Sequence, residues 1–155
     1  MASMDVRPIS GVGIGLRSQH IHEILTDLPA IPWLELLADN HLADGGLDVA
    51  QLQSIAEHYP LTLHCVGMSL ASVDPLDKAY CLRIKQLAQQ VNAAWVSEHL
   101  CFTSAMGFQS HDLLPIPYNE VTLKHCVDRV MKIQDLLGER LLIENVSSYM
   151  AFNNT

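Results

Sequence analysis

The chain alternates between two patterns of apolar residues. Short runs of apolar and β-branched residues alternate with longer stretches in which apolar residues recur every three or four positions. The first pattern is typical of buried strands and the second of amphipathic helices. Strands are expected at Val12–Leu16, Trp33–Leu37, Leu61–Val66, Trp95–Leu100 and Leu141–Glu144. Helices are expected at Ser18–Leu28, Leu47–His58, Pro75–Val91 and Asn119–Leu137.

Residues with strong local preferences mark several of these boundaries. Pro60 directly precedes the third expected strand. The pair Asp74-Pro75 places a capping side chain before a proline, which predicts that the third helix begins there. The pair Asn119-Glu120 opens the fourth helix, and Gly138 follows its last turn in the position of a C-cap. The long segment Phe102–Pro117 between the fourth strand and the fourth helix is expected to be a loop.

This order of elements predicts an α/β fold with a parallel sheet and right-handed crossovers. An open doubly wound sheet and part of a (β/α)₈ TIM barrel both fit five strands and four helices. A complete barrel needs about 250 residues, whereas this chain has 155. As a barrel, residues 1–155 would form the N-terminal part of a single domain, truncated after about five strands and four helices.

Composition narrows the classes of partner. The formal net charge is −8 with His neutral, and the chain has no basic stripe, so nucleic acid is not expected as a partner. Its apolar runs are too short to cross a membrane. Without an export signal the protein is expected in the cytoplasm, with its four cysteines reduced and buried or half-buried.

The glycines of GVGIGLR invite comparison with a dinucleotide-binding loop. Gly15, however, comes one position too early for GxGxxG. The acidic residue needed after the second strand would have to be Asp39. The motif therefore fits nucleotide binding poorly.

Candidate metal ligands fall near the ends of three consecutive expected strands, namely His64, His99 and Glu144. Because the carboxyl ends of parallel strands meet at one side of a sheet, these side chains are expected to converge. Two imidazoles and a carboxylate suit iron, manganese or zinc. Taken singly, each could instead be a hydrogen-bonded strand residue. Glu98 should point to the opposite strand face and act as a structural partner rather than a ligand.

Further polar residues are expected at the same side of the sheet, near the carboxyl ends of its strands. His20 follows the first strand, and Asn40 with His41 follows the second. Asp112, preceded by His111, lies in the long segment and either orients substrate or caps a turn. We take His20, Asn40 and Asp112 as candidate catalytic residues.

Six ordered motifs carry a resemblance to a known family: GVGIGLRSQH, WLELLADNH, LTLHCVGMSLAS with DPLD, VSEHLCF, DLLPIPY and LLIENVSSYMAF. Together they resemble the multinuclear non-haem iron-dependent oxidative enzymes, which include the iron subunit of the methanobactin oxazolone/thioamide-forming enzyme. The resemblance extends from Ile9 to Phe152.

The resemblance implies a xylose-isomerase-like TIM barrel that holds two or three irons at the carboxyl ends of its strands. It matches His64, His99 and Glu144 to metal ligands, with Glu144 a bridge between two irons. It also implies an activity in the biosynthesis of ribosomally made, post-translationally modified peptides (RiPPs). Members use O₂ to modify cysteines of a precursor peptide that a separate leader-presenting protein delivers.

Family members are longer and supply further ligands from later strands, so the iron centre of this chain is expected to be partial. Exposed first and fifth strands would favour a homodimer or aggregation, with little activity for the chain alone. A divalent-metal hydrolase or isomerase of the TIM-barrel type is an alternative function. An inactive, metal-free fragment is another.

Overall fold

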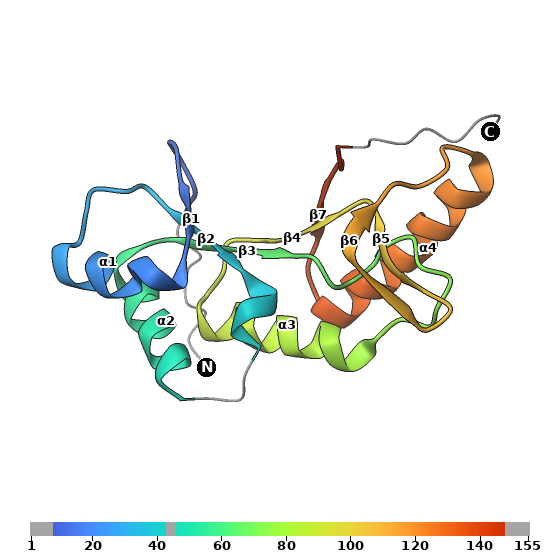
Figure 1. The fold of residues 1–155 in the computed structure, drawn as a ribbon. Coiled ribbons are helices and arrows are strands. Elements are labelled where there is room, and N and C mark those ends of the chain that lie inside the picture. The colour runs from blue at the N-terminus through green and yellow to red at the C-terminus, as the bar shows by residue number, and fades with distance from the viewer. Residues whose placement is uncertain (1–7, 43–45, 148–155) are drawn as a thin grey trace. The chain divides into compact units, whose positions relative to one another are not determined.

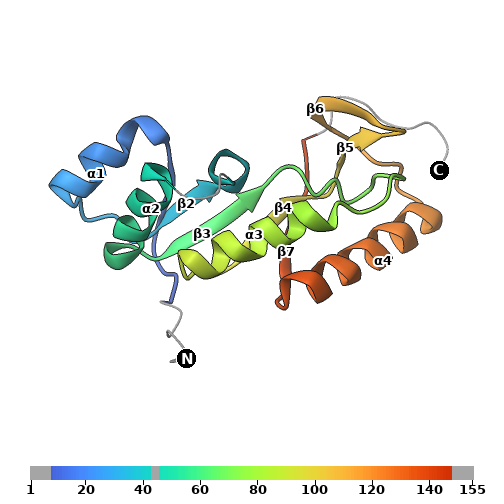
Figure 2. The ribbon, with the colours of Figure 1, turned by 90° about the horizontal axis from the view of Figure 1, so that it is seen from below.

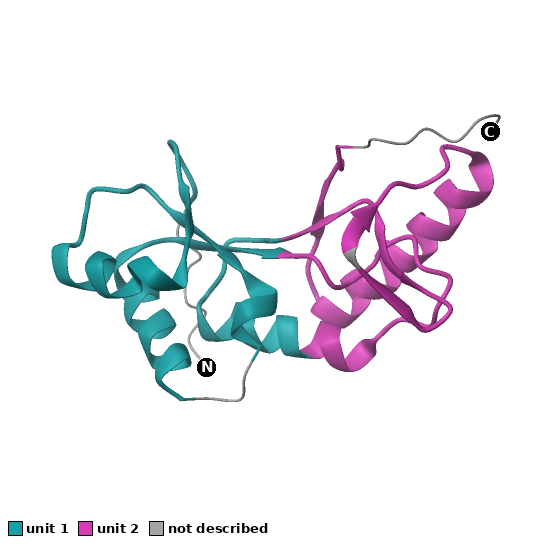
Figure 3. Cartoon of the chain, viewed as in Figure 1, with its two compact units in different colours: residues 1–64, 83–96 teal, residues 65–82, 97–155 magenta. Residues whose placement is uncertain are grey.

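The computed structural model describes residues 8–42 and 46–147 and separates the chain into two compact units. Unit 1 comprises Met1–His64 and Arg83–Val96, and unit 2 comprises Cys65–Leu82 and Ser97–Thr155 (Figure 3). The third and fourth strands and the third helix each pass from one unit into the other.

Strands and helices alternate along most of the chain (Figure 1). The strands are β1 Ile14–Leu16, β2 Leu34–Leu37, β3 Leu61–Cys65, β4 Val96–His99, β5 Phe102–Ala105, β6 Phe108–Leu114 and β7 Leu141–Glu144. The α-helices are α1 Ile21–Asp27, α2 Leu47–His58, α3 Lys78–Gln90 and α4 Glu120–Leu137. Two 3-10 helices cover Ser18–His20 and Ala38–His41. All five strands expected of the main sheet are present, with ends that differ by a few residues.

The main sheet has the strand order β1-β2-β3-β4-β7. The pairs β1–β2 and β2–β3 are parallel. The predicted α/β class with a mostly parallel sheet is therefore confirmed. The arrangement is compatible with part of a TIM barrel, and the described residues contain no closed barrel.

Unit 1 builds its core from the inward faces of β2 and α2. Leu34 and Leu36 alternate on one face of β2, and both are fully buried. Leu52 and Ile55, three positions apart on α2, are also fully buried, as expected for one stripe of an amphipathic helix. Helix α1 contacts α2.

The segment Phe102–Pro117 contains a hairpin, so the prediction of a loop was wrong. Strands β5 and β6 pair in antiparallel fashion around Met106 and Gly107, whose φ angles are 53° and 76°. Two successive positive φ angles are typical of a type I′ turn. Sequence periodicity did not reveal the hairpin because β5 is short and the ladder is irregular between Phe102 and Ser104.

Side chains from the segment between β3 and α3 hold this hairpin within unit 2. Ser69 Oγ accepts hydrogen bonds from the N–H groups of Thr103 (2.9 Å) and Ser104 (3.3 Å). The Asp74 carboxylate accepts hydrogen bonds from the turn, from Met106 N (2.7 Å) and Gly107 N (3.0 Å).

Helix α3 begins at Lys78 rather than at Pro75, which corrects the predicted boundary. Asp77 Oδ1 accepts a hydrogen bond from Tyr80 N at 2.9 Å, so Asp77 supplies the cap expected of Asp74. Asp74 is instead engaged with the hairpin turn. The prediction that an aspartate caps this helix was right. The cap is Asp77 because Asp74 makes a tertiary contact with the hairpin turn.

Both predicted ends of α4 are confirmed. Asn119 Oδ1 accepts from Thr122 N at 2.9 Å, and Gly138 adopts a left-handed conformation with a φ of 81°. Helix α4 contacts β7 in unit 2 (Figure 2). Within the described part of the chain, no helix combines the length and apolar content needed to cross a membrane.

Candidate metal centre

Two candidate ligands come together in unit 2 because their strands are neighbours. Leu100 N, directly after β4, donates a hydrogen bond of 2.8 Å to the carbonyl oxygen of Glu144 at the end of β7. This pairing brings the carboxyl ends of the two strands together. His99 Nε2 lies 3.7 Å from Glu144 Oε1.

This separation suits two ligands of one metal ion. A distance of 3.7 Å is too long for an ordinary hydrogen bond between nitrogen and oxygen. Two donors that each lie about 2.1 Å from one ion are roughly 3.0–3.6 Å apart for angles of 90–120°. An imidazole and a carboxylate are also ligands that iron, zinc and manganese accept. The pair therefore fits a metal with a small adjustment of the exposed Glu144.

The two side chains open into a cavity of about 460 Å³ in unit 2. His99 is largely buried, with 11% of its side chain exposed, whereas 59% of the Glu144 side chain is exposed. The cavity is also lined by Asp112, Leu113, Leu114, Pro115, Asn145, Val146 and Ser147. A largely buried imidazole and an exposed carboxylate therefore line the same cavity, which is large enough for a small substrate group. Asn145 and Ser147 were not singled out from the sequence, although they directly follow the β7 ligand.

Asp112 lines this cavity, as its candidate role requires. Its Oδ1 accepts a hydrogen bond of 2.8 Å from the backbone N–H of Leu113. The side chain therefore makes a local backbone contact and still faces the cavity, so both roles considered from the sequence remain predictions. The side chain of the preceding His111 lies outside the described residues.

His64 lies on β3 and is the last residue of that segment of unit 1. Its Cα pairs with that of Leu37 on β2, and its side chain is half-buried. Among the described residues, His64, His99 and Glu144 make up the group of side chains that could hold a metal ion. The three ligands expected from the sequence are thus the candidates that the structure offers.

The other two candidate catalytic residues belong to unit 1. His20 is exposed, and its Nδ1 lies 3.4 Å from Glu23 Oε2. Asn40 is exposed on the second 3-10 helix. The neighbouring His41 is buried, with its Nδ1 2.9 Å from Asp48 Oδ2. His41 therefore has a structural contact, while the roles of His20 and Asn40 remain predictions.

The four cysteines are free and buried, as predicted. Burial raises the pKa of Cys81 to about 11. Burial, together with the negative charge of Glu98, raises the pKa of Cys101 to about 12. Since the thiolate is the reactive form, these two thiols are poor nucleophiles near neutral pH.

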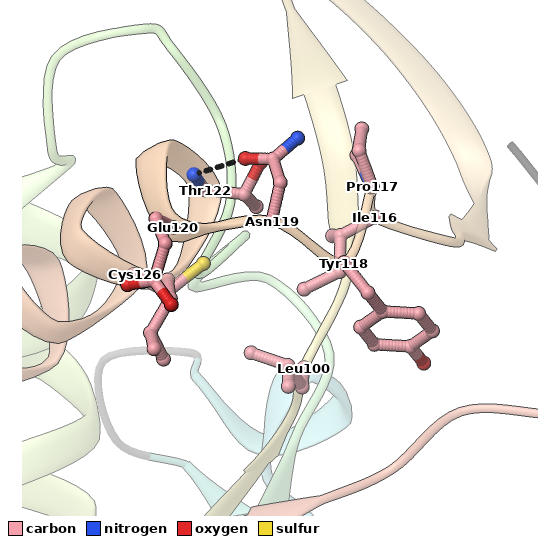
Figure 4. A pocket seen from close by; sticks show the side chains of 9 residues that line it. Leu100, Ile116, Pro117, Tyr118, Asn119, Glu120, Thr122 and Cys126 are labelled. Atoms are coloured by element: carbon pink, nitrogen blue, oxygen red, sulfur yellow. Dashed lines mark hydrogen bonds between the residues drawn. The ribbon is translucent and has the colours of Figure 1, made fainter. Parts of the chain in front are cut away.

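A second cavity of about 480 Å³ lies at the N-terminus of α4 (Figure 4). Its walls include Leu100, Ile116 and Tyr118, and the Asn119 cap of α4 lies at its edge. Its lining holds one carboxylate, one thiol and no histidine. The chemistry of the linings therefore favours the cavity of His99 and Glu144 as the metal centre.

Comparison with known proteins shows the family to which the chain belongs. The family model described as RiPP precursor modification enzyme MbnB/TglH/ChrH matches residues 11–155. The chain belongs to this family. The match includes both strands that carry His99 and Glu144, as well as β3 with His64. The resemblance found in the sequence motifs is thereby confirmed, and with it a family role in modifying ribosomally made precursor peptides.

Relatives of this family occur in several bacteria. The chain is 49% identical over 146 residues to a UPF0276 protein of Acaryochloris marina, covering 94% of this chain and 52% of the relative. It is 42% identical to a UPF0276 protein of an Anaeromyxobacter species, with the same coverage. A UPF0276 protein of Caulobacter vibrioides is 40% identical over 97% of this chain and 54% of its own length. The chain thus spans about half the length of these relatives.

Proposed function

We propose that this chain forms part of an iron-dependent oxidative enzyme that uses O₂ to modify cysteine residues of ribosomally made precursor peptides. The observation that carries the proposal is the His99–Glu144 pair, 3.7 Å apart in a cavity of unit 2, in a chain of the RiPP precursor modification family. The imidazole and carboxylate supply donors suited to iron. The family supports a precursor peptide as the substrate, and the cavity of about 460 Å³ is large enough to admit a side chain of that peptide.

We assign His64 as the third ligand. It occupies the strand before β4 in the sheet order and follows the same pattern of a donor near the strand's carboxyl end. Two histidines and one carboxylate leave coordination positions open on a non-haem iron. Two or three irons require more donors than these three residues provide, so we expect the chain alone to bind about one iron.

Each part of the cavity has a role in this proposal. Bound iron would supply the O₂ and one-electron chemistry that protein side chains lack. His99 and Glu144 would hold the metal, while Leu113, Leu114 and Pro115 would shield the entering cysteine side chain from water. Asp112 would orient the peptide through its carboxylate. A leader-presenting protein would deliver the peptide.

Metal binding by the isolated chain tests the proposal. The purified chain is loaded anaerobically with Fe²⁺, desalted and analysed for metal content and for its optical spectrum after exposure to air. We expect about one iron per chain and an O₂-dependent absorption band. His99→Ala and Glu144→Gln should each reduce the bound iron at least about 10-fold, since each removes a direct ligand.

Two exposed residues provide matched controls. His22→Ala and Glu120→Gln remove the same chemical groups from helix surfaces away from the cavity lining and should leave iron binding unchanged. Equal iron content in all five proteins would refute the proposed centre. Binding of Zn²⁺ or Mn²⁺ in place of Fe²⁺, with no O₂-dependent band, would favour the metal-dependent hydrolase or isomerase instead.

A further inference from the structure

Glu98 is a fully buried acidic residue next to a proposed metal ligand. It lies on β4, and none of its surface is exposed to solvent. Burying an ionised carboxylate costs several kcal/mol unless donors compensate it. Because strand side chains alternate, Glu98 and His99 leave β4 on opposite faces, so Glu98 lies behind the ligand rather than in the cavity.

Backbone donors from two segments compensate the Glu98 carboxylate. Its Oε2 accepts a hydrogen bond of 2.8 Å from Met68 N, in the segment after β3. Its Oε1 accepts a bond of 2.7 Å from the N–H of His99 itself. The structural role predicted for Glu98 is thus confirmed, and one oxygen is tied directly to the backbone of the ligand.

The two ring nitrogens of His99 face two different carboxylates. Nδ1 lies 3.7 Å from Glu98 Oε1, and Nε2 lies 3.7 Å from Glu144 Oε1. The distances are equal, but the surroundings differ, because Glu98 is fully buried and the Glu144 side chain is 59% exposed. Water screens an exposed charge far more than a buried one. The stronger field therefore acts at Nδ1.

A neutral imidazole carries one N–H, which its surroundings place on one of the two nitrogens. A negative charge beside Nδ1 favours the proton on that atom and leaves the Nε2 lone pair free. In metalloproteins, a carboxylate that accepts a hydrogen bond from a ligating histidine fixes its tautomer; at 3.7 Å, Glu98 would act on Nδ1 through its charge. Here the free lone pair would face Glu144, where the proposed metal binds.

We propose that Glu98 is a positioning residue that holds the N–H of His99 on Nδ1 and directs the Nε2 lone pair toward Glu144. This inference rests on the proposed metal centre for its purpose, but the tautomer itself is a property of the metal-free chain. Glu98 touches neither the metal nor the substrate in this scheme. In the metal-free chain, Glu98 would already give His99 the tautomer that binds a metal ion through Nε2.

Nitrogen-15 NMR of the histidine side chains tests this directly. In the metal-free wild-type chain, at a pH high enough for every histidine to be neutral, we expect His99 to show a protonated Nδ1 and an unprotonated Nε2, with the signal assigned by its loss in His99→Gln. A wild-type His99 with its proton on Nε2 would overturn the inference. This measurement does not depend on whether any variant folds.

Substitution tests the source of the preference. Glu98→Gln removes the negative charge while keeping the shape of the side chain. It should give His99 a mixture of tautomers and weaken Co²⁺ binding, followed optically, by about 10- to 100-fold, the usual effect of losing a residue that orients a ligand. An unchanged tautomer and unchanged affinity in Glu98→Gln would also overturn the inference.

Arg129→Lys is the matched control. The Arg129 guanidinium donates to the Met68 carbonyl oxygen at 3.4 Å and to that of Asp74 at 2.8 Å, so its loss disturbs the same segment without touching His99. It should lower the melting temperature but leave the His99 tautomer and Co²⁺ affinity unchanged. If wild-type His99 has the expected tautomer but the chain binds neither Co²⁺ nor Fe²⁺, the proposed function fails while the role of Glu98 stands.

Discussion

Gly13 lies against the indole ring of Trp33 in unit 1. A Cβ built at this position would overlap the ring, whereas one built at Gly15 would meet only Arg17 Nε at 4.0 Å. Trp33 also packs edge-on against Trp95, with ring centroids 5.9 Å apart. Gly13, which resembled part of a nucleotide-binding loop, is therefore needed for packing, because a side chain at this position would occupy the space of the Trp33 ring.

Replacing these two glycines should have different effects. Gly13→Ala should lower the free energy of unfolding by about 1–3 kcal/mol, because the added methyl group displaces Trp33. Gly15→Ala should change it by less than about 0.5 kcal/mol, as an exposed substitution without a close neighbour does. Urea denaturation followed by tryptophan fluorescence measures both. Equal effects of the two changes would contradict this account of Gly13.

The hairpin β5–β6 shows how one element can be positioned by another. Its strand β6 ends in Leu113 and Leu114, which line the candidate metal cavity. Its turn is fixed by the Asp74 carboxylate, through Met106 N and Gly107 N. A single side chain in the segment before α3 thus anchors the far end of the element that forms a wall of the cavity.

Loss of this anchor should loosen the hairpin turn. Asp74→Ala should speed hydrogen exchange at Met106 and Gly107 by about 10-fold, which corresponds to the ~1.5 kcal/mol of a hydrogen bond to a charged acceptor. Asp77→Ala removes a nearby aspartate that caps α3, and it should cost about 1 kcal/mol of stability without changing those two amides. Unchanged exchange in Asp74→Ala would show that the hairpin turn is held by other contacts.

At the scale of the whole molecule, the strands that end the sheet order expose apolar side chains. β1 and β7 stand at the two ends of that order. Ile14 of β1 is 49% exposed, and Leu142 and Ile143 of β7 are each 47% exposed. Strand edges with exposed apolar residues promote association between chains. The homodimer expected from the sequence therefore remains a prediction with a structural basis.

Sedimentation velocity over a range of concentrations tests this prediction. The wild-type chain should show concentration-dependent association. Ile143→Lys should weaken it at least about 10-fold, because lysine on a strand edge opposes pairing between chains. Val121→Lys, on the exposed surface of α4, provides the control and should leave association unchanged. A monomer at every concentration would show that the exposed edges do not drive association.

The sequence by itself determined the features that depend on local chemistry. Apolar periodicity predicted the order of the main strands and helices, and Asn119 and Gly138 marked the ends of α4. The residue types and strand positions of His64, His99 and Glu144 identified the ligand candidates, since parallel strands place their carboxyl ends together.

Only the tertiary structure decided the features that depend on contacts between distant segments. Ser69 and Asp74 hold a hairpin more than thirty residues away, and Met68 donates to Glu98 across a similar separation. The distance between His99 and Glu144 likewise follows from the pairing after β4. Hydrogen-bond partners of this kind carry no periodic signal along the chain, because they depend on which segments the fold brings together.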